Sequence, residues 1–144
     1  MLKYLLDTNV YIDAARDEAF AVRLDEFLMR WLPHTFVSSV VMHELRLGAR
    51  TPADQRDLDR IEEPFMLRGR LLTPSSSAWT RAATVLRAQR GASIGKTSRA
   101  EAADALLACQ SRELGLTLVT SDTDFARLQK VVPGLRWSRP FPVA

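Results

Sequence analysis

The sequence predicts a single-domain α/β/α sandwich with a mainly parallel central sheet. Short apolar runs of four or five residues, typical of strands buried on both faces, alternate with longer segments of helical periodicity. This alternation is the pattern of α/β folds. The 144 residues, 47% hydrophobic and 26% charged, have the size and composition of one globular domain. We expect that domain over residues 1–137 and an irregular tail over residues 138–144.

The expected strands and helices follow one another in regular order. The strands are expected at residues 3–6, 35–38, about 71–72, 116–119 and 135–137. The helices are expected at residues 10–15, 19–31, 39–48, 52–63, 75–90 and 98–113, with a short one through Phe125 and Leu128. The chain contains no internal repeat and no low-complexity segment.

Capping residues and prolines set the expected boundaries in the first half of the chain. Ser38 or Ser39 can cap the third helix. Thr51 and Pro52 stand in the order that starts a helix, with a cap followed by a first-turn proline. This helix should stop before Pro64, because a proline disfavours helical geometry in the residue that precedes it.

Serines and glycines set the boundaries in the second half. Residues 75–77 are serines that can begin a helix, and Gly91 can end it. The segment 91–97 has two glycines and no periodicity, so we expect an exposed loop. Residues 98–101 match the capping-box pattern, and residues 121–124 form a second box-like helix start.

Four carboxylates interrupt segments that are otherwise suited to burial. Asp7 ends the first strand, and Asp122 follows the strand over residues 116–119. Because open α/β sheets bind ligands beyond the carboxyl ends of their strands, both acids fall at the rim of the expected crevice. Glu44 and Asp104 have mainly apolar neighbours three and four positions away, whereas a solvent-facing acid lies opposite such a stripe. We expect their helices to pack beside the crevice.

Four clustered carboxylates would repel one another. Two like charges about 6 Å apart repel by roughly 3 kcal/mol at an effective dielectric constant near 20. Several acids would therefore have to protonate unless a cation separates them. Mg²⁺ or Mn²⁺ suits an oxygen-ligand set without cysteine or paired histidines. Without these four acids, 20 basic residues stand against 13 acidic ones, and such a basic body fits a polyanionic substrate with a metal between them, although a coding bias toward arginine explains the excess equally well.

Each acid also has a structural explanation when it is taken alone. These explanations are helix capping for Asp7, pairing with a core arginine for Glu44, and the helix dipole for Asp122 and Asp124. The capping box accounts for Glu101, and the isolated His34 and His43 are interpreted as structural. All four acids together are much harder to explain in these ways.

The length of the apolar runs also indicates the cellular compartment. The longest apolar run is far shorter than the ~18 residues that a membrane span needs. Asp7 breaks the N-terminal apolar stretch before a signal-peptide core could form. We therefore expect a cytoplasmic protein without a membrane segment. The single cysteine, Cys109, cannot form an internal disulfide and is interpreted as a small core residue.

The segments around these acids resemble the PIN-domain ribonucleases, and within them the VapC-type toxins of bacterial toxin–antitoxin pairs. The resemblance runs from Leu5 to about Trp137 and rests on the order and spacing of four motifs. The motifs are Leu5-Leu6-Asp7-Thr8-Asn9, Ser39 through Glu44-Leu45 to Gly48, Asp104-Ala105-Leu106-Leu107-Ala108, and Leu118-Val119-Thr120-Ser121-Asp122-Thr123-Asp124-Phe125.

The resemblance implies Mg²⁺- or Mn²⁺-dependent hydrolysis of RNA phosphodiester bonds by an endoribonuclease that uses a metal-activated water. It implies Asp7 and Asp104 as direct metal ligands. Glu44 and Asp122 would bind through water or hold a second ion. Residues implied as further contributors are Asp124, Thr8, Asn9 and Thr120. A small antitoxin that enters the acidic groove and a homodimer are the implied protein partners.

Other functions stay open at this point. A PIN nuclease of RNA maturation or decay would carry the same acids, and an antitoxin gene immediately upstream would separate the two. An aspartate-nucleophile phosphatase also places its nucleophile after the first strand. That enzyme needs a second acid two residues later, where this chain has Asn9. A catalytically silent binding module is the third alternative.

Overall fold

The chain folds around one five-stranded sheet in a computed structural model that describes residues 1–90 and 97–141. The strands are β1 (Tyr4–Leu6), β2 (Thr35–Ser38), β3 (Leu71–Leu72), β4 (Thr117–Val119) and β5 (Arg136–Ser138). The helices are α1 (Thr8–Arg16), α2 (Glu18–Trp31), α3 (Ser39–Gly48), α4 (Pro52–Leu67), α5 (Ser76–Arg90), α6 (Arg99–Leu114) and α7 (Phe125–Val131), with a short 3-10 helix, η1 (Leu32–His34).

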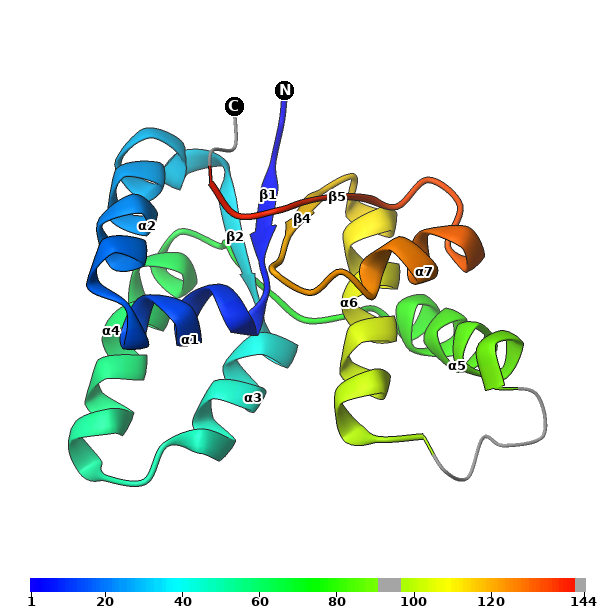
Figure 1. The fold of residues 1–144 in the computed structure, drawn as a ribbon, viewed down its shortest axis with the longest axis horizontal. Helices are drawn as coiled ribbons and strands as arrows, with labels where there is room; N and C mark the ends of the chain where they lie inside the picture. Colours follow the sequence, from blue (N-terminus) through cyan, green and yellow to red (C-terminus); the bar gives the residue numbers. More distant parts are fainter. Residues whose placement is uncertain (91–96, 142–144) are drawn as a thin grey trace.

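The sheet has the strand order β3-β2-β1-β4-β5, and every neighbouring pair is parallel. The central strand β1 places Leu5 opposite Phe36 of β2 and opposite Leu118 of β4. Helices α1 to α4 cover one side of the sheet, and α5 to α7 cover the other (Figure 1). The predicted α/β/α sandwich is therefore confirmed.

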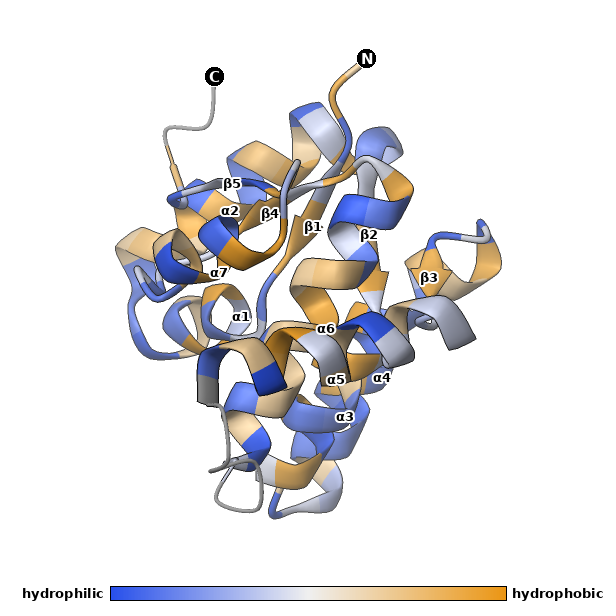
Figure 2. Ribbon diagram, turned by 90° about the vertical axis from the view of Figure 1, so that its right-hand side faces the viewer, coloured by the Kyte–Doolittle hydropathy of each residue, from blue (hydrophilic) through white to orange (hydrophobic). Residues whose placement is uncertain are grey.

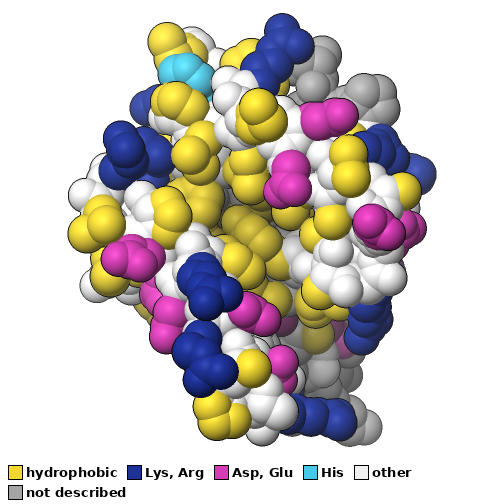
Figure 3. Space-filling view, turned by 90° about the vertical axis from the view of Figure 1, so that its left-hand side faces the viewer, with side chains coloured by type: hydrophobic (Ala, Val, Ile, Leu, Met, Phe, Trp, Pro, Cys, Tyr) yellow, Lys and Arg dark blue, Asp and Glu magenta, His cyan; other side chains and the backbone are white. Residues whose placement is uncertain are grey.

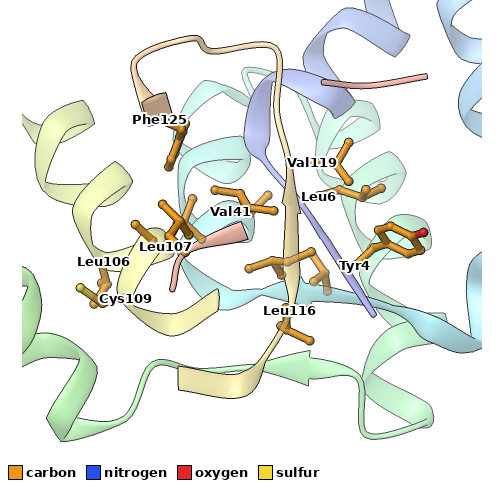
Figure 4. Close-up of a cluster of buried hydrophobic side chains, with 14 of the residues drawn as sticks. Tyr4, Leu6, Val41, Leu106, Leu107, Cys109, Leu116, Val119 and Phe125 are labelled. Atoms are coloured by element: carbon orange, nitrogen blue, oxygen red, sulfur yellow. The ribbon is translucent and has the colours of Figure 1, made fainter. Parts of the chain in front are cut away.

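The core lies on both faces of the central strands. Leu5, Leu6, Val37 and Leu118 are fully buried, as expected for strands that have helices on both sides. Figure 4 shows Leu107 of α6 among the side chains of this cluster. In Figure 2 the strands β1 and β3 are mainly orange, whereas the helices alternate between orange and blue. This is the pattern of amphipathic helices on a buried sheet.

Cys109 is buried within the α6 side of the core (Figure 4). Its side chain is 2% exposed, which confirms its interpretation as a small core residue. Apolar side chains also gather in a hollow on the face that α1 to α4 form, with charged groups around it (Figure 3). Helices α2 and α4 contribute exposed apolar side chains to the surface, namely Val22, Met29, Met66 and Leu67.

The predicted end of α4 before Pro64 is wrong. The helix continues to Leu67 with Pro64 inside it, although proline removes one helical hydrogen bond and crowds the preceding turn. The next residue, Phe65, is 3% exposed and belongs to the core, so burial of its ring offsets this penalty. The chain then turns at Gly69, whose φ is +68°, and the Arg70 N–H donates to the Phe65 carbonyl oxygen.

Two further expectations concern the ends of elements. The tail was expected to be irregular from residue 138, but Ser138 pairs with Val119 as the last residue of β5. Beyond the strand, the Phe141 ring packs against Phe27 of α2. The expected loop 91–97 lies outside the described residues except for Thr97, and so does the tail from residue 142. Within the described parts of the chain, no helix combines the length and apolarity that a membrane crossing requires.

Candidate active site

The acidic site lies at the carboxyl end of the central strand β1, where the chain connections lead to opposite sides of that strand. From β1 the chain passes to β2 on one side, while β4 lies on the other side of β1. Such a switch point leaves a crevice at the carboxyl ends of the strands. Here the Asp7 N–H donates to the Val119 carbonyl oxygen at 2.9 Å, which brings the end of β1 against the end of β4.

Asp7 is held on both carboxylate oxygens. Oδ1 accepts from the Thr8 backbone N–H at 2.7 Å, and Oδ2 accepts from the Thr120 hydroxyl at 2.8 Å and the Asn9 amide at 3.2 Å. The residue is also the N-cap of α1, so the capping explanation of Asp7 is correct without excluding a role in the site. Only 4% of Asp7 is exposed. Its neighbours therefore fix its orientation.

Glu44 enters the site from α3. The Thr8 hydroxyl donates to Glu44 Oε1 at 2.9 Å and ties the start of α1 to the middle of α3. The nearby Arg46 is engaged elsewhere, because its guanidinium pairs with Asp59 at 2.9 Å and with Glu62. The Thr8 hydroxyl therefore holds Glu44. Because Arg46 pairs with Asp59 and Glu62, it does not support the alternative in which Glu44 pairs with a core arginine.

Asp122 follows β4 in a turn that the site organises. Its N–H donates to the Thr120 hydroxyl oxygen at 3.0 Å, and its own Oδ1 accepts from the Asp124 N–H at 2.8 Å. The predicted box-like helix start at residues 121–124 is therefore wrong, since α7 begins only at Phe125. The reason is that Ser121 binds to α1 and does not cap α7. Its N–H donates to Asn9 Oδ1, and its hydroxyl donates to Asp13 Oδ2.

Asp104 approaches from α6, and electrostatics connect it to the other acids. Burial raises its pKa from 3.8 to about 8, with further increases from repulsion by four carboxylates, those of Asp7, Asp122, Glu44 and Asp124. Burial likewise raises the pKa of Asp7 to about 6. The hydrogen bonds from Thr120 and Thr8 lower that value, and repulsion by Glu44 and Asp122 raises it. The surrounding carboxylates thus lie close enough to oppose the ionisation of Asp7 and Asp104.

The donor set of the site consists of oxygen atoms in an excess of negative charge. Such a donor set suits a hard divalent cation, since a cation would offset the burial and the repulsion that together raise both pKa values. Among the described residues, no group of three or more His, Cys, Asp or Glu side chains is already arranged as a metal-binding group. His43 is exposed, and His34 lies next to the Trp31 ring with centroids 6.2 Å apart.

An open pocket adjoins the acids on the α6 side. Its lining residues are Gln89, Glu101, Asp104, Asp124, Arg127 and Leu128. The sequence did not indicate Arg127, Ser121 or Asp13 as residues of the site. The spacing of three residues between Asp124 and Arg127 could have indicated their pairing. No local pattern could have indicated that Ser121 contacts Asp13, because 108 positions separate the two residues.

A parallel α/β sheet with acidic side chains at its switch point defines a class of α/β proteins that have a polar binding site beyond the carboxyl ends of the strands. The PIN domain family model matches residues 4–131, and the chain belongs to the PIN domain family. The family match excludes the aspartate-nucleophile phosphatase among the alternatives.

Solved structures of similar fold come from bacterial complexes. One chain of DNA-bound VapBC from Salmonella typhimurium is 26% identical, with a TM-score of 0.67 and coverage of 96% of this chain and 98% of that chain. VapBC-1 from nontypeable Haemophilus influenzae is 22% identical, with a TM-score of 0.65 and coverage of 96% and 98%.

A toxin–antitoxin complex from Klebsiella pneumoniae is 21% identical, with a TM-score of 0.61 and coverage of 98% and 100%. The comparison with curated proteins found no match. The family and the VapBC likeness together support a PIN nuclease of the toxin–antitoxin type.

Proposed function

We propose that this protein is a Mg²⁺- or Mn²⁺-dependent endoribonuclease and the toxin of a toxin–antitoxin pair. One observation carries the proposal: hydrogen bonds through Thr8 and Thr120 gather carboxylates of separate elements around Asp7, and repulsion by these carboxylates adds to the burial that raises the pKa of Asp7 and Asp104. A protein gains nothing in stability from such repulsion. The arrangement is explained if the acids together bind a cation that the reaction requires.

Asp7 and Asp104 are the proposed direct metal ligands, and Glu44 and Asp122 are proposed to bind through water or to hold a second ion. When bound, the cation would supply positive charge for the leaving oxygen and would lower the pKa of an attacking water. The protein orients the ligands. Thr120 and Asn9 hold Oδ2 of Asp7, while Thr8 holds Glu44. Asp124 is a further candidate ligand.

The proposed substrate is RNA, and the proposed protein partners are a small antitoxin and a second copy of the chain. The toxin–antitoxin complex among the similar structures supports the first partner. The apolar hollow on the face of α1 to α4 suits an amphipathic segment of such a partner (Figure 3). We propose the cytoplasm as the compartment, where both RNA and an antitoxin would be present.

The substitution Asp7→Asn tests the proposed reaction, because it removes one charge while retaining the size of the side chain. We expect RNA cleavage in Mg²⁺ to fall by about 10³-fold, corresponding to roughly 4 kcal/mol of activation free energy. Cleavage of a labelled RNA by the purified variant measures this, and thermal unfolding checks that the variant is folded. A folded variant with wild-type activity would show that Asp7 is not a metal ligand of the reaction.

The toxin role has a separate test. Co-expression with the product of the gene immediately upstream should relieve growth inhibition and give a stable complex. A PIN nuclease of RNA processing would cleave RNA without either effect. The outcome therefore distinguishes the two nuclease functions without bearing on the metal site.

A further inference from the structure

The acidic site opens into a pocket whose walls are not all acidic. The pocket has a volume of about 370 Å³ and lies between α5, α6 and the start of α7. Asp104 belongs both to this pocket and to the four acids. A substrate strand that binds at the acids would therefore extend into this pocket.

Arg127 is the only cation among the lining residues that the structure describes. One of its Nη2 hydrogens is donated to Asp124 Oδ1 at 3.0 Å, and the two side chains are 75% and 63% exposed. An exposed ion pair of this kind contributes little free energy, because water competes for both partners. Because a guanidinium has five donors, Arg127 can bind a second ligand while it keeps its contact to Asp124.

Asp124 connects Arg127 to the reaction site. The Asp124 N–H donates to Asp122 Oδ1 at 2.8 Å, so the turn that positions Asp122 also positions the partner of Arg127. A planar guanidinium can donate two parallel hydrogen bonds to a phosphate, which a carboxylate-lined pocket cannot otherwise attract. The pair thus places a phosphate-binding group beside Asp104 before any substrate arrives.

We propose that Arg127 binds a phosphate of the RNA next to the one that is cleaved, and that Asp124 orients the guanidinium for this contact. The inference rests on the proposed ribonuclease function and adds a substrate-positioning residue to it. The contact is made equally in the ground state and the transition state. Its loss therefore raises KM and leaves kcat unchanged.

The test compares Arg127→Ala with Lys130→Ala in cleavage of a short single-stranded RNA in Mg²⁺. Lys130 is a matched control, because it is an exposed cation on the same helix and does not line the pocket. We expect Arg127→Ala to raise KM about tenfold and to reduce the salt dependence of binding by about one phosphate contact. Lys130→Ala should retain both values. Arg127→Lys should recover part of the loss, since it keeps the charge without the planar fork.

Two further measurements separate the possible outcomes. RNA affinity is measured by fluorescence anisotropy in the Asp7→Asn background, where cleavage does not interfere. The Mg²⁺-dependent shift in melting temperature should be the same for Arg127→Ala and wild type, and a lost shift would assign Arg127 a structural role and overturn the inference. If Arg127→Ala cleaves RNA with the KM and the salt dependence of the wild type, this inference is overturned and the proposed function is not. A wild-type protein that neither binds nor cleaves RNA overturns the proposed function as well.

Discussion

The two carboxylates proposed as direct metal ligands are held in different ways. Asp7 lies at the sheet edge, is 4% exposed and accepts hydrogen bonds from Thr8, Asn9 and Thr120. Asp104 lies on α6 beside an open pocket, and mainly burial and repulsion shape its pKa. The hydrogen bonds to Asp7 favour its charged form, and its pKa of about 6 is below the value of about 8 for Asp104.

This difference indicates a division of labour within the site. Without a cation, Asp7 ionises at a lower pH than Asp104. Asp7, between β1 and β4, thus offers a negative charge more readily. Asp104, on α6, becomes charged only at a higher pH or when a cation offsets the repulsion. A cation would then bind first to the ionised Asp7, and its binding would favour the ionisation of Asp104.

The largest effect is expected for Asp104→Asn. Activity in Mg²⁺ should fall by about 10³-fold, as for Asp7→Asn, because a proposed metal ligand is lost. Without metal, the variant should melt at a higher temperature than wild type above pH 8, since the repelling charge is absent. Cleavage assays and melting curves in a chelator check both expectations. A destabilised variant would contradict the repulsion that we describe at Asp104.

A smaller effect is expected for Thr120→Val, which removes the hydroxyl that holds Asp7 while retaining the shape of the side chain. Loss of this buried hydrogen bond should destabilise the protein by about 1–3 kcal/mol. We also expect about a tenfold loss of activity, because Asp7 is less well oriented. Thr117→Val is the control at the start of β4, the strand that precedes Thr120, and it lies outside the hydrogen-bond network of the site. Denaturant unfolding and cleavage rates measure the difference between the two variants.

The smallest effect is a dependence of stability on pH. Because burial raises the folded-state pKa of Asp7 and Asp104 above 3.8, the folded protein binds more protons than the unfolded chain between pH 4 and 8. Stability without metal should therefore fall as the pH rises through this range, and Mg²⁺ should stabilise the protein more at pH 8 than at pH 5. Melting temperatures at several pH values measure this. Asp104→Asn is the control and should flatten the upper part of the decline.

Most of the architecture could be predicted from the sequence because local chemistry specifies it. The apolar runs and capping residues placed the five strands, and the position of Asp7 after the first strand indicated the crevice. Two local signals were misleading. Pro64 was read as a helix stop, although the burial of Phe65 carries α4 past it. The segment 121–124 was read as a helix start, although contacts to α1 occupy Ser121.

The sequence by itself determined which residue types stand at the strand ends and on the apolar helix faces, and hence the chemical character of the site. Only the tertiary structure decided which of them interact. It joined Thr120 to Asp7 across 113 positions and Thr8 to Glu44 across 36 positions. It also placed Arg127 in the pocket beside Asp104. The physical reason is that local propensities act over a few residues, whereas hydrogen bonds, burial and charge repulsion depend on distances that only the packed sheet creates.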